Sequence, residues 1–488
     1  MSTTATAASP TLRTLADLPG PRGLPILGNA LQIRRERIHQ QLEDWARIHG
    51  DPYVVRIGRR KCLVVSAPDT VANVLRARPD GFRRNERVET ASRDLGFLGL
   101  FSAEGETWRR QRPMVLAGLD PAHIREFFPA LLDVTERLRR RWEQAADAGA
   151  AIDLQADLMR YTVDVTTGLA FGEDLHTLEA RSDDTIQRHL NVVLPALVRR
   201  ILSPVDLPGW LRHWRERELR LHLQELRAAV DGFIAATRRK LADDPSLRER
   251  PQNLIQAMVA ARDREGSGVG DEDVAGNVFT MLLAGEDTTA NTLAWMVWLL
   301  HRNPAAAALA RDEVDAVLAG SPALREAAQL QRLDVVDACA HEAMRLKPVA
   351  PFIGAQAMQD TVVAGVQVPR GTLVLCLMRP AGLDGATFAR PEAFDPKRRL
   401  GEQGAAHAMA SARRATMPFG AGPRMCPGRY LALAEIKLVI AMLLAHFEVD
   451  SVEAEGGGEP RETFAFVMAP ERLRMRLRRR STARAAAA

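Results

Sequence analysis

Apolar residues recur every three or four positions along much of the chain, as they do on the buried face of an amphipathic helix. From about residue 122 to 241 this spacing is interrupted at 147–149, 172–174 and 204–209, where Gly, Pro and Asp favour turns. A longer, almost continuous apolar stretch, Asp271–Arg302, predicts one long buried helix. The pattern therefore predicts a mainly α-helical protein.

A smaller part of the chain has the period of two and the β-branched residues that are typical of strands. We expect this β-rich part to cover about 18–66 and 350–380. Residues 58–60 separate its first two strands and predict a hairpin turn. The strands expected on this basis are Tyr53–Ile57, 61–65, Thr361–Val363 and 367–374.

The remaining segments are assigned from their period and their turn residues. Short helices are expected at Ile38–His49 and 69–76. Residues 79–105 and 348–357 lack a clear period and predict irregular segments, the first of them a loop at the border of a pocket. Residues 473–477 alternate with a period of two and predict an edge strand with its basic residues in solvent, an interpretation that we favour over a nucleic-acid patch.

Composition narrows the function classes. The 488 residues carry 66 Lys and Arg against 61 Asp and Glu, and a net charge of +5 gives no general case for nucleic-acid binding. The four cysteines are scattered and form no Cys-x-x-Cys pair, which argues against a zinc or iron–sulfur site and against a disulfide framework. Residues 1–17 have no signal-like core and no span near ~20 apolar residues, so we expect a disordered tail on a cytoplasmic protein.

One cysteine stands in a glycine-rich stretch, Phe-Gly-Ala-Gly-Pro-Arg-Met-Cys-Pro-Gly at 419–428. A thiolate is a strong soft ligand, and the glycines allow the backbone to turn tightly enough for its amides to point at the sulfur. An apolar-periodic run follows with Pro427 in its first turn, so a helix dipole is expected to lower the pKa of the Cys426 thiol. Cys426 is thus a candidate metal ligand; the alternative is a buried structural cysteine.

Polar residues interrupt the long apolar helix at Ala-Gly-Glu-Asp-Thr-Thr, residues 284–289. Buried polar groups need partners, which points to a function for this segment. Gly285 is expected to let a ligand approach the backbone, and Thr288 is expected to bond a carbonyl one turn earlier and to open a groove. Four residues share one helix face and are expected to border a pocket, although each could equally be core: Asn277, Thr280, Met281 and Ala284.

The pattern Phe-x-x-Gly-x-Arg-x-Cys-x-Gly at 419–428 resembles the haem-binding signature of the cytochrome P450s. The resemblance implies that Cys426 is the axial ligand of the iron of haem b. It also implies one haem-thiolate domain over 18–488, mainly α, with about a dozen helices and a small β-rich subdomain near the N-terminus. The residues implied to shape the haem loop are Phe419, Gly422, Arg424, Cys426 and Gly428.

Two further matches concern oxygen and the haem propionates. The polar segment of the long helix resembles the family's oxygen-binding motif, in which an acid and an alcohol deliver protons to dioxygen; Asp287 and Thr288 match them, beside Gly285. Trp108 and Arg112 stand four apart at the start of a helical stretch and match a Trp-x-x-x-Arg pair that hydrogen-bonds a propionate. On its own, that pair would favour an amphipathic surface helix with a snorkelling arginine, and the cysteine motif reverses that preference.

Glu342 and Arg345 resemble the family's Glu-x-x-Arg, which locks against a later arginine, here Arg398, as a structural clamp on the cysteine loop. Outside that context an i,i+3 pair contributes only about 0.2–0.5 kcal/mol. Arg399 stands where an aromatic residue is common in the family. Gln356 stands where many members have a propionate-binding arginine, so a hydrogen bond about half as strong is expected and haem affinity or potential is expected to differ.

The resemblance also implies where substrate lies. Ile353 and Val467 are implied to line the pocket, the second within 464–468, which matches the family's last substrate-contacting turn. Residues 201–210 fall where the family has a mobile lid over the substrate channel. The pocket candidates are mostly small or apolar, so a terpenoid, steroid, fatty acyl chain or polyketide would each fit.

Together, these matches imply a monooxygenase that inserts one atom of O2 into a lipophilic organic substrate, because a thiolate ligand favours O–O cleavage. Two alternatives are a peroxide-driven peroxygenase and a non-enzymatic haem sensor. The presence of both Asp287 and Thr288 favours the monooxygenase over the first. Nothing in the chain resembles the output module that the second would need.

The chain has no dinucleotide-binding glycine pattern and no flavin or iron–sulfur module. NAD(P)H is therefore expected to act only through a separate reductase, with a ferredoxin or flavodoxin as the electron carrier. We expect a monomer with no nucleic-acid partner and no membrane anchor. The arginines expected to form a docking surface for an acidic carrier are Arg109, Arg110, Arg413, Arg414 and Arg429.

Overall fold

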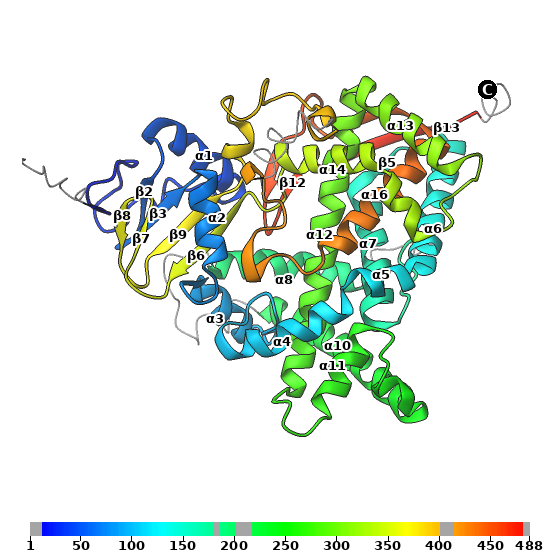
Figure 1. The fold of residues 1–488 in the computed structure, drawn as a ribbon, viewed down its shortest axis with the longest axis horizontal. Coiled ribbons are helices and arrows are strands. Elements are labelled where there is room, and N and C mark those ends of the chain that lie inside the picture. The colour runs from blue at the N-terminus through cyan, green and yellow to red at the C-terminus, as the bar shows by residue number, and fades with distance from the viewer. Residues whose placement is uncertain (1–11, 180–184, 202–216, 401–413, 482–488) are drawn as a thin grey trace, which may run out of the picture.

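Helix α12 (Asp271–Arg302) crosses the middle of the molecule, with the largest sheet on one side of it and most of the other helices on the other side (Figure 1). The computed structural model describes residues 12–179, 185–201, 217–400 and 414–481. Residues 289–300 of α12 are buried on every face, as the continuous apolar pattern predicts. The bounds of this helix are those expected from the sequence.

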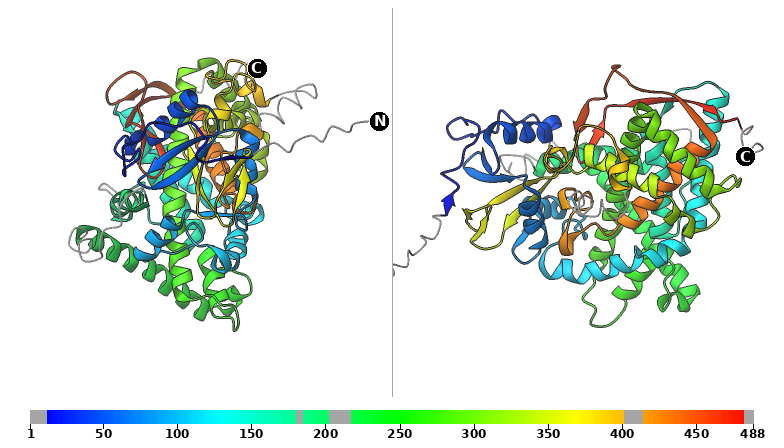
Figure 2. Two further views of the ribbon diagram at one scale, coloured as in Figure 1. Left: turned by 90° about the vertical axis from the view of Figure 1, so that its left-hand side faces the viewer. Right: turned by 45° about the horizontal axis from the view of Figure 1, so that its top comes forward.

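Most of the other α-helices pack around α12, with α16 beside it, whereas α1 and α2 lie against the large sheet (Figures 1 and 2). Among the described residues, no helix is both long enough and apolar enough to span a membrane. Besides α12, the α-helices of the described residues are α1 (Ile38–His49), α2 (Pro68–Arg76), α3 (Glu86–Asp94), α4 (Gly105–Gly118), α5 (Pro121–Glu126), α6 (Phe128–Asp147), α7 (Leu154–Phe171), α8 (Thr185–Ile201), α10 (Arg217–Asp243), α11 (Leu254–Arg262), α13 (Pro304–Leu318), α14 (Asp334–Leu346) and α16 (Arg429–His446).

The largest sheet has the strand order β2-β3-β9-β6-β4 and joins the two parts of the chain that the sequence predicts to be β-rich. The β2–β3 hairpin forms as expected, and β3 pairs in parallel with β9. The strands are β1 (Arg13–Thr14), β2 (Tyr53–Ile57), β3 (Arg60–Val65), β4 (Phe82–Arg84), β5 (Ile152–Asp153), β6 (Phe352–Ala357), β7 (Thr361–Val363), β8 (Val366–Val368), β9 (Leu373–Leu377), β10 (Phe447–Ala454), β11 (Glu462–Phe464), β12 (Met468–Pro470) and β13 (Leu473–Arg479).

Two segments that the sequence analysis treats as irregular are regular in the structure. Residues 79–105 contain β4 and α3; the helix is capped by the Asn85 side chain and is too polar to show an apolar period. Residues 348–357 contain β6, which pairs with β9 and β4 on its two edges. Its buried positions are filled by small residues, Ala355 and Ala357, which explains the weak alternation.

The two ends of the chain also differ from expectation. Leu473, Met475 and Leu477 are buried and the arginines between them are more exposed, as predicted, but β13 is the central strand of β10-β13-β5 and not an edge strand. Its partner β10 pairs along its whole length, and short β5 covers the other edge. Residues 12–17 are ordered, because β1 pairs in parallel with β8, so the expectation of a disordered tail over 1–17 does not hold for them.

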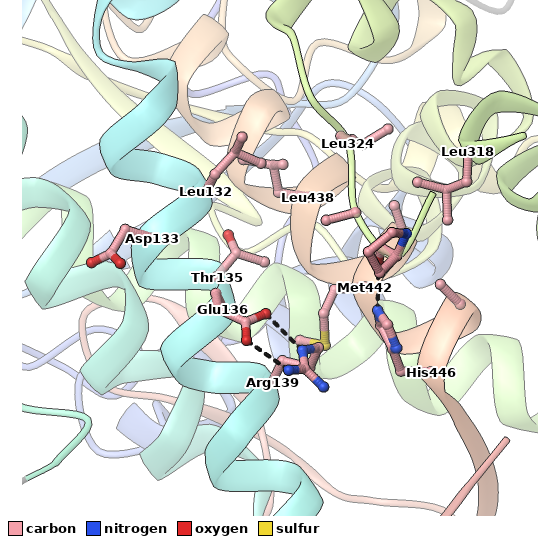
Figure 3. A pocket seen from close by; sticks show the side chains of 14 residues that line it. Leu132, Asp133, Thr135, Glu136, Arg139, Leu318, Leu324, Leu438, Met442 and His446 are labelled. Carbon is pink, nitrogen blue, oxygen red and sulfur yellow. Dashed lines mark hydrogen bonds and ion pairs between the residues drawn. The ribbon is translucent and has the colours of Figure 1, made fainter. Parts of the chain in front are cut away.

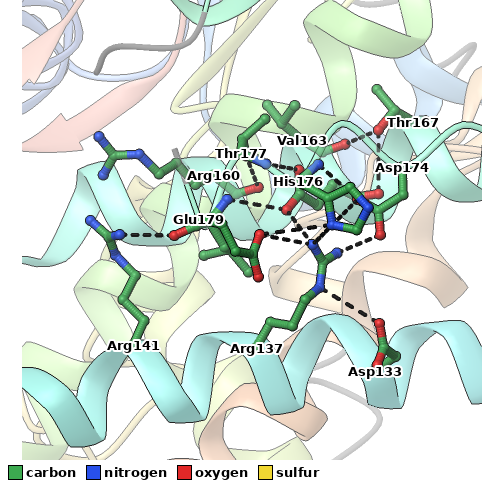
Figure 4. A network of polar contacts seen from close by, with 12 residues as sticks. Asp133, Arg137, Arg141, Arg160, Val163, Thr167, Asp174, His176, Thr177 and Glu179 are labelled. Carbon is green, nitrogen blue, oxygen red and sulfur yellow. Dashed lines mark hydrogen bonds and ion pairs between the residues drawn. The ribbon is translucent and has the colours of Figure 1, made fainter. Parts of the chain in front are cut away.

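A buried arginine fixes the segment that follows α7 to helix α6 (Figure 4). The Arg137 guanidinium contacts Asp174 at 2.7 Å, Glu179 at 3.0 Å and Asp164 at 3.4 Å. Burial raises the pKa of Asp164, although the backbone N–H of Thr177 donates to its carboxylate at 2.8 Å. This network is structural, since it joins three consecutive segments of the helical part.

Candidate functional site

The loop before α16 holds Cys426 through backbone contacts. The Cys426 N–H donates to the Phe419 carbonyl at 2.9 Å and closes the loop. Gly422 has a φ of +73°, and a Cβ there would lie 2.6 Å from the Cα of Arg76 in α2. This glycine is therefore needed for the close approach of the loop to α2, a reason that the sequence analysis did not give.

The sulfur of Cys426 lies beside the start of α16. Gly428 is the N-cap, so α16 begins two residues after Pro427, and a Cβ at Gly428 would be 3.9 Å from the sulfur. Burial raises the pKa of the Cys426 thiol; the Gly428 N–H and the charges of Arg112 and Arg429 oppose that change only in part. The lowered pKa expected from the helix dipole is therefore wrong, because the cost of burying the thiolate charge is larger than the effect of the helix N-terminus.

Three of the predicted haem residues meet next to this loop. The Arg424 guanidinium stacks over the Trp108 ring at 4.5 Å, and it is paired with Glu104 at 2.6 Å. The Arg112 guanidinium donates to the Met425 carbonyl at 2.5 Å. Trp108, Arg112 and Arg424 come from two distant parts of the sequence, so their meeting agrees with the role that the resemblance implies for them.

Two further arginines, which the sequence analysis missed, lie in the same place. Arg78 is 3% exposed, and Arg84 is the last residue of β4. Burial and the charges of Arg78 and Arg424 lower the pKa of Arg84 to about 9. Sequence motifs indicate Arg112 and Arg424, whereas Arg84 appears only in the pair Arg83–Arg84, within a segment that is predicted to be a loop.

The arginine cluster lacks enough negative charge. Buried guanidinium nitrogens of Arg78, Arg84, Arg112 and Arg424 have no hydrogen-bond partner among the described residues, and Glu104 is the one carboxylate that appears in the charge environment of both Arg84 and Arg424. Buried charge without a partner is costly, so the cluster is complete only with an anion. A haem carries two carboxylates, which would pair with these arginines. Its iron would then lie near the sulfur of Cys426.

Helix α12 supplies the other side of the site. The Thr288 hydroxyl donates to the Ala284 carbonyl at 2.9 Å, as expected from the sequence. Ala284 is exposed and Asp287 and Thr288 are part-exposed, although the helix is buried for the next three turns, so this stretch of α12 faces open space inside the fold. Burial raises the pKa of Asp287 to about 6.

The structure gives Gly285 a packing role that differs from the ligand-access role expected from the sequence. A Cβ at this position would lie 2.3 Å from the Thr166 hydroxyl of α7, so the glycine permits α12 and α7 to pack closely. One residue on, the Glu286 carbonyl accepts a hydrogen bond from the Thr162 hydroxyl of α7 at 3.1 Å. Gly285 thus faces a neighbouring helix, and the expectation that it opens the backbone to a ligand is not supported by this contact.

The other pocket candidates fall into two groups. Asn277 is 1% exposed and accepts from the Leu100 N–H at 2.9 Å, and Thr280 bonds the Gly276 carbonyl at 2.8 Å, so both hold local structure. Met281 is 8% exposed, on the same helix as the exposed Ala284.

The last two pocket candidates lie outside α12. Ile353 is part-buried in β6, and Val467 is buried next to Phe466, whose ring contacts Phe101 at 5.6 Å. These positions stay predictions as substrate contacts.

The predicted clamp is present. The Arg345 guanidinium donates to Glu342 at 2.7 and 2.9 Å, and Arg398 of the 3-10 helix Pro396–Arg399 reaches the same carboxylate at 3.2 Å. Arg345 also donates to the carbonyls of three residues between 382 and 393. The pair is almost fully buried, so it fastens this segment to α14.

The proposed docking arginines differ in their surroundings. Arg109 is exposed but is already paired with Asp80 at 2.8 Å and Glu106 at 2.5 Å, and Arg110 lies 3.5 Å from Asp273. Arg429 is the first residue of α16, next to the cysteine loop, and it donates to the Cys426 carbonyl at 3.4 Å. Arg414 is the first residue of the described range 414–481, and its side chain is exposed. Arg413 and the expected lid, apart from residue 201, lie outside the described residues.

The chain belongs to the cytochrome P450 family, whose family model matches residues 18–477. It is 28% identical over 465 residues to the pentalenene oxygenase of Streptomyces avermitilis, with 94% of this chain and 97% of that protein covered. It is 29% identical over 451 residues to the cyclooctat-9-en-7-ol 5-monooxygenase of Streptomyces melanosporofaciens, with 92% and 93% covered. The solved haem domain of cytochrome P450DA has a TM-score of 0.82 at 24% identity, covering 96% of this chain and 99% of that one, which supports the fold.

These comparisons confirm the resemblance and the fold class that the sequence predicts. The protein is an enzyme of the haem monooxygenase family, an oxidoreductase class that uses O2. The family explains why the arginine cluster and Cys426 share one site, because the members carry a haem.

Proposed function

We propose that this enzyme inserts one oxygen atom of O2 into a lipophilic organic substrate, by hydroxylation or epoxidation. The observation that carries the proposal is the Asp287–Thr288 pair on the stretch of α12 that faces open space. The exposed position one turn before Thr288 is the small residue Ala284, which leaves room for an apolar substrate. Two relatives are named for oxygenation of pentalenene and cyclooctat-9-en-7-ol, and these compounds are the first to screen.

The proposed roles follow from the geometry of the chain's own residues. A haem b held by Cys426 supplies the iron chemistry that activates O2, and a thiolate ligand favours O–O cleavage. Asp287, with its pKa raised to about 6, can both hold and release a proton near neutral pH, which is what a general acid needs. Thr288 presents its hydroxyl to the same space and stays oriented by its bond to the Ala284 carbonyl.

Replacement of Thr288 by alanine tests this function. We expect product formed per NAD(P)H to fall about 100-fold, with hydrogen peroxide appearing instead, because one positioned proton-transfer group contributes about that much. The control is Thr292→Ala, one turn further along α12. The Thr292 hydroxyl also donates to a backbone carbonyl one turn earlier, that of Thr288, at 2.8 Å. A peroxide-driven enzyme would instead turn over with peroxide alone and would be nearly unaffected by Thr288→Ala.

The arginine cluster is proposed to bind the haem carboxylates through Arg78, Arg84, Arg112 and Arg424, next to Trp108. Gln356, which stands where many members have an arginine, uses its amide locally, accepting from the Glu86 N–H at 3.1 Å and donating to the Gly371 carbonyl at 3.3 Å. The buried arginines from β4 and its vicinity offer positive charge in the same sheet region.

Replacement of Arg84 by glutamine is expected to speed haem loss about 10-fold or more, because a hydrogen bond to a charged group contributes about 1.5–3 kcal/mol. The measurement is the rate of haem transfer to excess apomyoglobin. The matched control is Arg83→Gln, since Arg83 is the neighbouring residue but is paired with Glu89. Equal rates in the two variants would contradict a role for Arg84 in haem binding.

Electrons are proposed to come from a separate carrier, a ferredoxin or flavodoxin reduced at the expense of NAD(P)H. Arg429 is the best-placed docking residue, because it begins α16 directly after the cysteine loop and lies over the exposed ring of Tyr430. The ion pairs of Arg109 neutralise much of its charge, so we assign it a smaller part. Monomeric state and cytoplasmic location stay predictions.

A further inference from the structure

Exposed apolar side chains gather in one short segment before α1. Of the eleven large apolar residues that are exposed in the described part of the chain, four lie within residues 24–31. They are Leu24, Ile26, Leu27 and Leu31, which are 47%, 75%, 43% and 72% exposed. Single exposed apolar residues are common on protein surfaces, but a cluster of this kind marks a surface that contacts a partner or a membrane.

This segment is held firmly, so the exposure is built into the fold. Two backbone hydrogen bonds of 2.8 and 2.9 Å join Leu24 to Gly28 and close a tight turn with Ile26 at its tip. The Leu27 carbonyl accepts from the Gly58 N–H at 3.0 Å, which fixes the turn to the β2–β3 hairpin. Ile26 has a φ of +65°, which is unfavourable for a β-branched residue, and its exposed side chain adds little to the core. Strain without a packing gain points to a function.

Arginines surround these apolar residues, and acids are scarce. Residues 22–37 hold four arginines and one acid, Glu36, and the turn of the neighbouring hairpin adds a fifth arginine. None of the five has an ion pair within the described residues. An apolar cluster bordered by unpaired positive charge fits an anionic lipid surface. These arginines, called the basic rim below, are Arg22, Arg34, Arg35, Arg37 and Arg59.

A polar pocket of about 270 Å³ begins directly after Leu31. Gln41 donates to the Gln32 carbonyl at 2.8 Å, which braces the pocket wall. The Arg34 guanidinium and the terminal nitrogens of Arg37 have no partner among the described residues, so both can bind an oxyanion such as a phosphate. The lining residues are Gln32, Arg34, Arg37, Gln40, Gln41 and Asp44, the last of which pairs with Arg47.

A pocket of about 290 Å³ between α6 and α16 differs in this respect (Figure 3). Its arginine, Arg139, donates to both oxygens of Glu136 at 2.6 Å. His446 bonds the Pro322 carbonyl at 2.7 Å. The guanidinium of that pocket is therefore satisfied within the protein, and we assign no anion to it.

We propose that the surface formed by residues 24–31 and the basic rim docks on an anionic phospholipid bilayer. The apolar side chains enter the boundary between the headgroups and the acyl chains, and Arg34 and Arg37 bind a headgroup phosphate. The rest of the basic rim adds attraction to the negatively charged surface. The contact is peripheral and needs no helix that crosses the bilayer. It goes beyond the proposed oxygen chemistry and brings the enzyme to the phase in which lipophilic compounds collect.

Co-sedimentation of the full-length holoenzyme with vesicles tests the proposal. We expect binding to phosphatidylcholine vesicles that contain phosphatidylglycerol, weaker binding at high salt, and little binding to phosphatidylcholine alone. Combining Arg34→Gln with Arg37→Gln should weaken binding about 30-fold, because each arginine near the lipid surface contributes about fivefold. Binding that does not depend on the anionic lipid, or no binding to either kind of vesicle, would overturn the proposal.

The matched control combines Arg239→Gln with Arg264→Gln. Both arginines are exposed and have no ion pair within the described ranges. Arg239 belongs to α10 and Arg264 follows α11, and these helices lie far from α1 (Figure 1). The control removes the same charge and should leave binding unchanged. An equal loss in the two double variants would show that overall charge drives binding, and it would overturn the assignment to this surface.

The apolar part is tested by Ile26→Asn. Asparagine accepts a positive φ more readily than isoleucine, so the variant should be at least as stable as the wild type in thermal unfolding. Vesicle binding should nevertheless fall about 10-fold or more, because the apolar side chain is lost. The control is Leu221→Asn, since Leu221 is 57% exposed on α10. Equal binding in these two variants would overturn the insertion of the segment into lipid.

Self-association is the other use of an exposed apolar surface. Sedimentation velocity of the wild type and of Ile26→Asn, without lipid, distinguishes the two, and we expect the same single species in both. A dimer that forms without lipid and is lost in Ile26→Asn would overturn the proposal. None of these measurements needs turnover, so a failure here leaves the proposed function intact, and a failure of that function leaves the lipid contact intact.

Discussion

Replacement of Cys426 by alanine should abolish the red-shifted Soret band that reduced, carbon monoxide-treated protein gives when a sulfur ligates the haem iron. The expectation follows from the site, because Cys426 supplies the sulfur beside the arginine cluster. The haem content of the purified protein should also fall, because only the contacts between the arginines and the haem carboxylates would remain to bind the haem.

The control for this variant is Cys376→Ala. Cys376 is fully buried in β9, and burial raises the pKa of its thiol to about 12, so it is a poor ligand. The spectrum of that variant should match the wild type. A red-shifted band that survives in Cys426→Ala would show that the ligand has been assigned wrongly, and it would remove the basis of the proposed oxygen chemistry.

Replacement of Glu342 by glutamine should lower the free energy of unfolding by about 3–5 kcal/mol, because the change leaves Arg345 and Arg398 buried without their carboxylate. The effect should reach the cysteine loop as well, since Arg345 fastens the segment that precedes it. The measurements are urea unfolding followed by near-ultraviolet circular dichroism and, in parallel, the haem content of the purified protein.

The comparison variant is Glu448→Gln. Glu448 pairs with Arg311 at 3.1 Å, but both side chains are partly exposed, and such pairs contribute about 0–1 kcal/mol. A loss in Glu342→Gln no larger than in Glu448→Gln would mean that the clamp is not a stabilising feature of the fold.

The local sequence pattern correctly predicted those elements whose buried face or turn is determined by residues within the element itself. The helix Ile38–His49 and α12 have the expected bounds, and the β2–β3 hairpin forms as expected with β3 beginning one residue early at Arg60, because each has a strong period or a strong turn. The failures came from partners far away in the sequence. β13 is a central strand because β10 and β5, which are distant in the sequence, pair with its two edges. Helix α3 was missed because only a few of its residues are buried, so its sequence shows little apolar periodicity.

The candidate site was predictable where a short motif contains its own chemistry. Cys426, the Asp287–Thr288 pair and the clamp of Glu342 with Arg345 were all identified in this way. Arg78 and Arg84 were not, because a buried, unpartnered arginine is defined by its surroundings and the sequence shows only a charge. The pKa of the Cys426 thiol was misjudged for the same reason, since burial cannot be read from the helix that follows.

The strand order of the large sheet has a consequence for synthesis on the ribosome. β3 pairs with β9, which emerges about 300 residues later. At about 5–20 residues per second, the β2–β3 hairpin waits about 15–60 s with one edge unpaired. That edge can pair with other nascent chains during the wait, so the growing chain is open to edge-to-edge aggregation until β9 has been made.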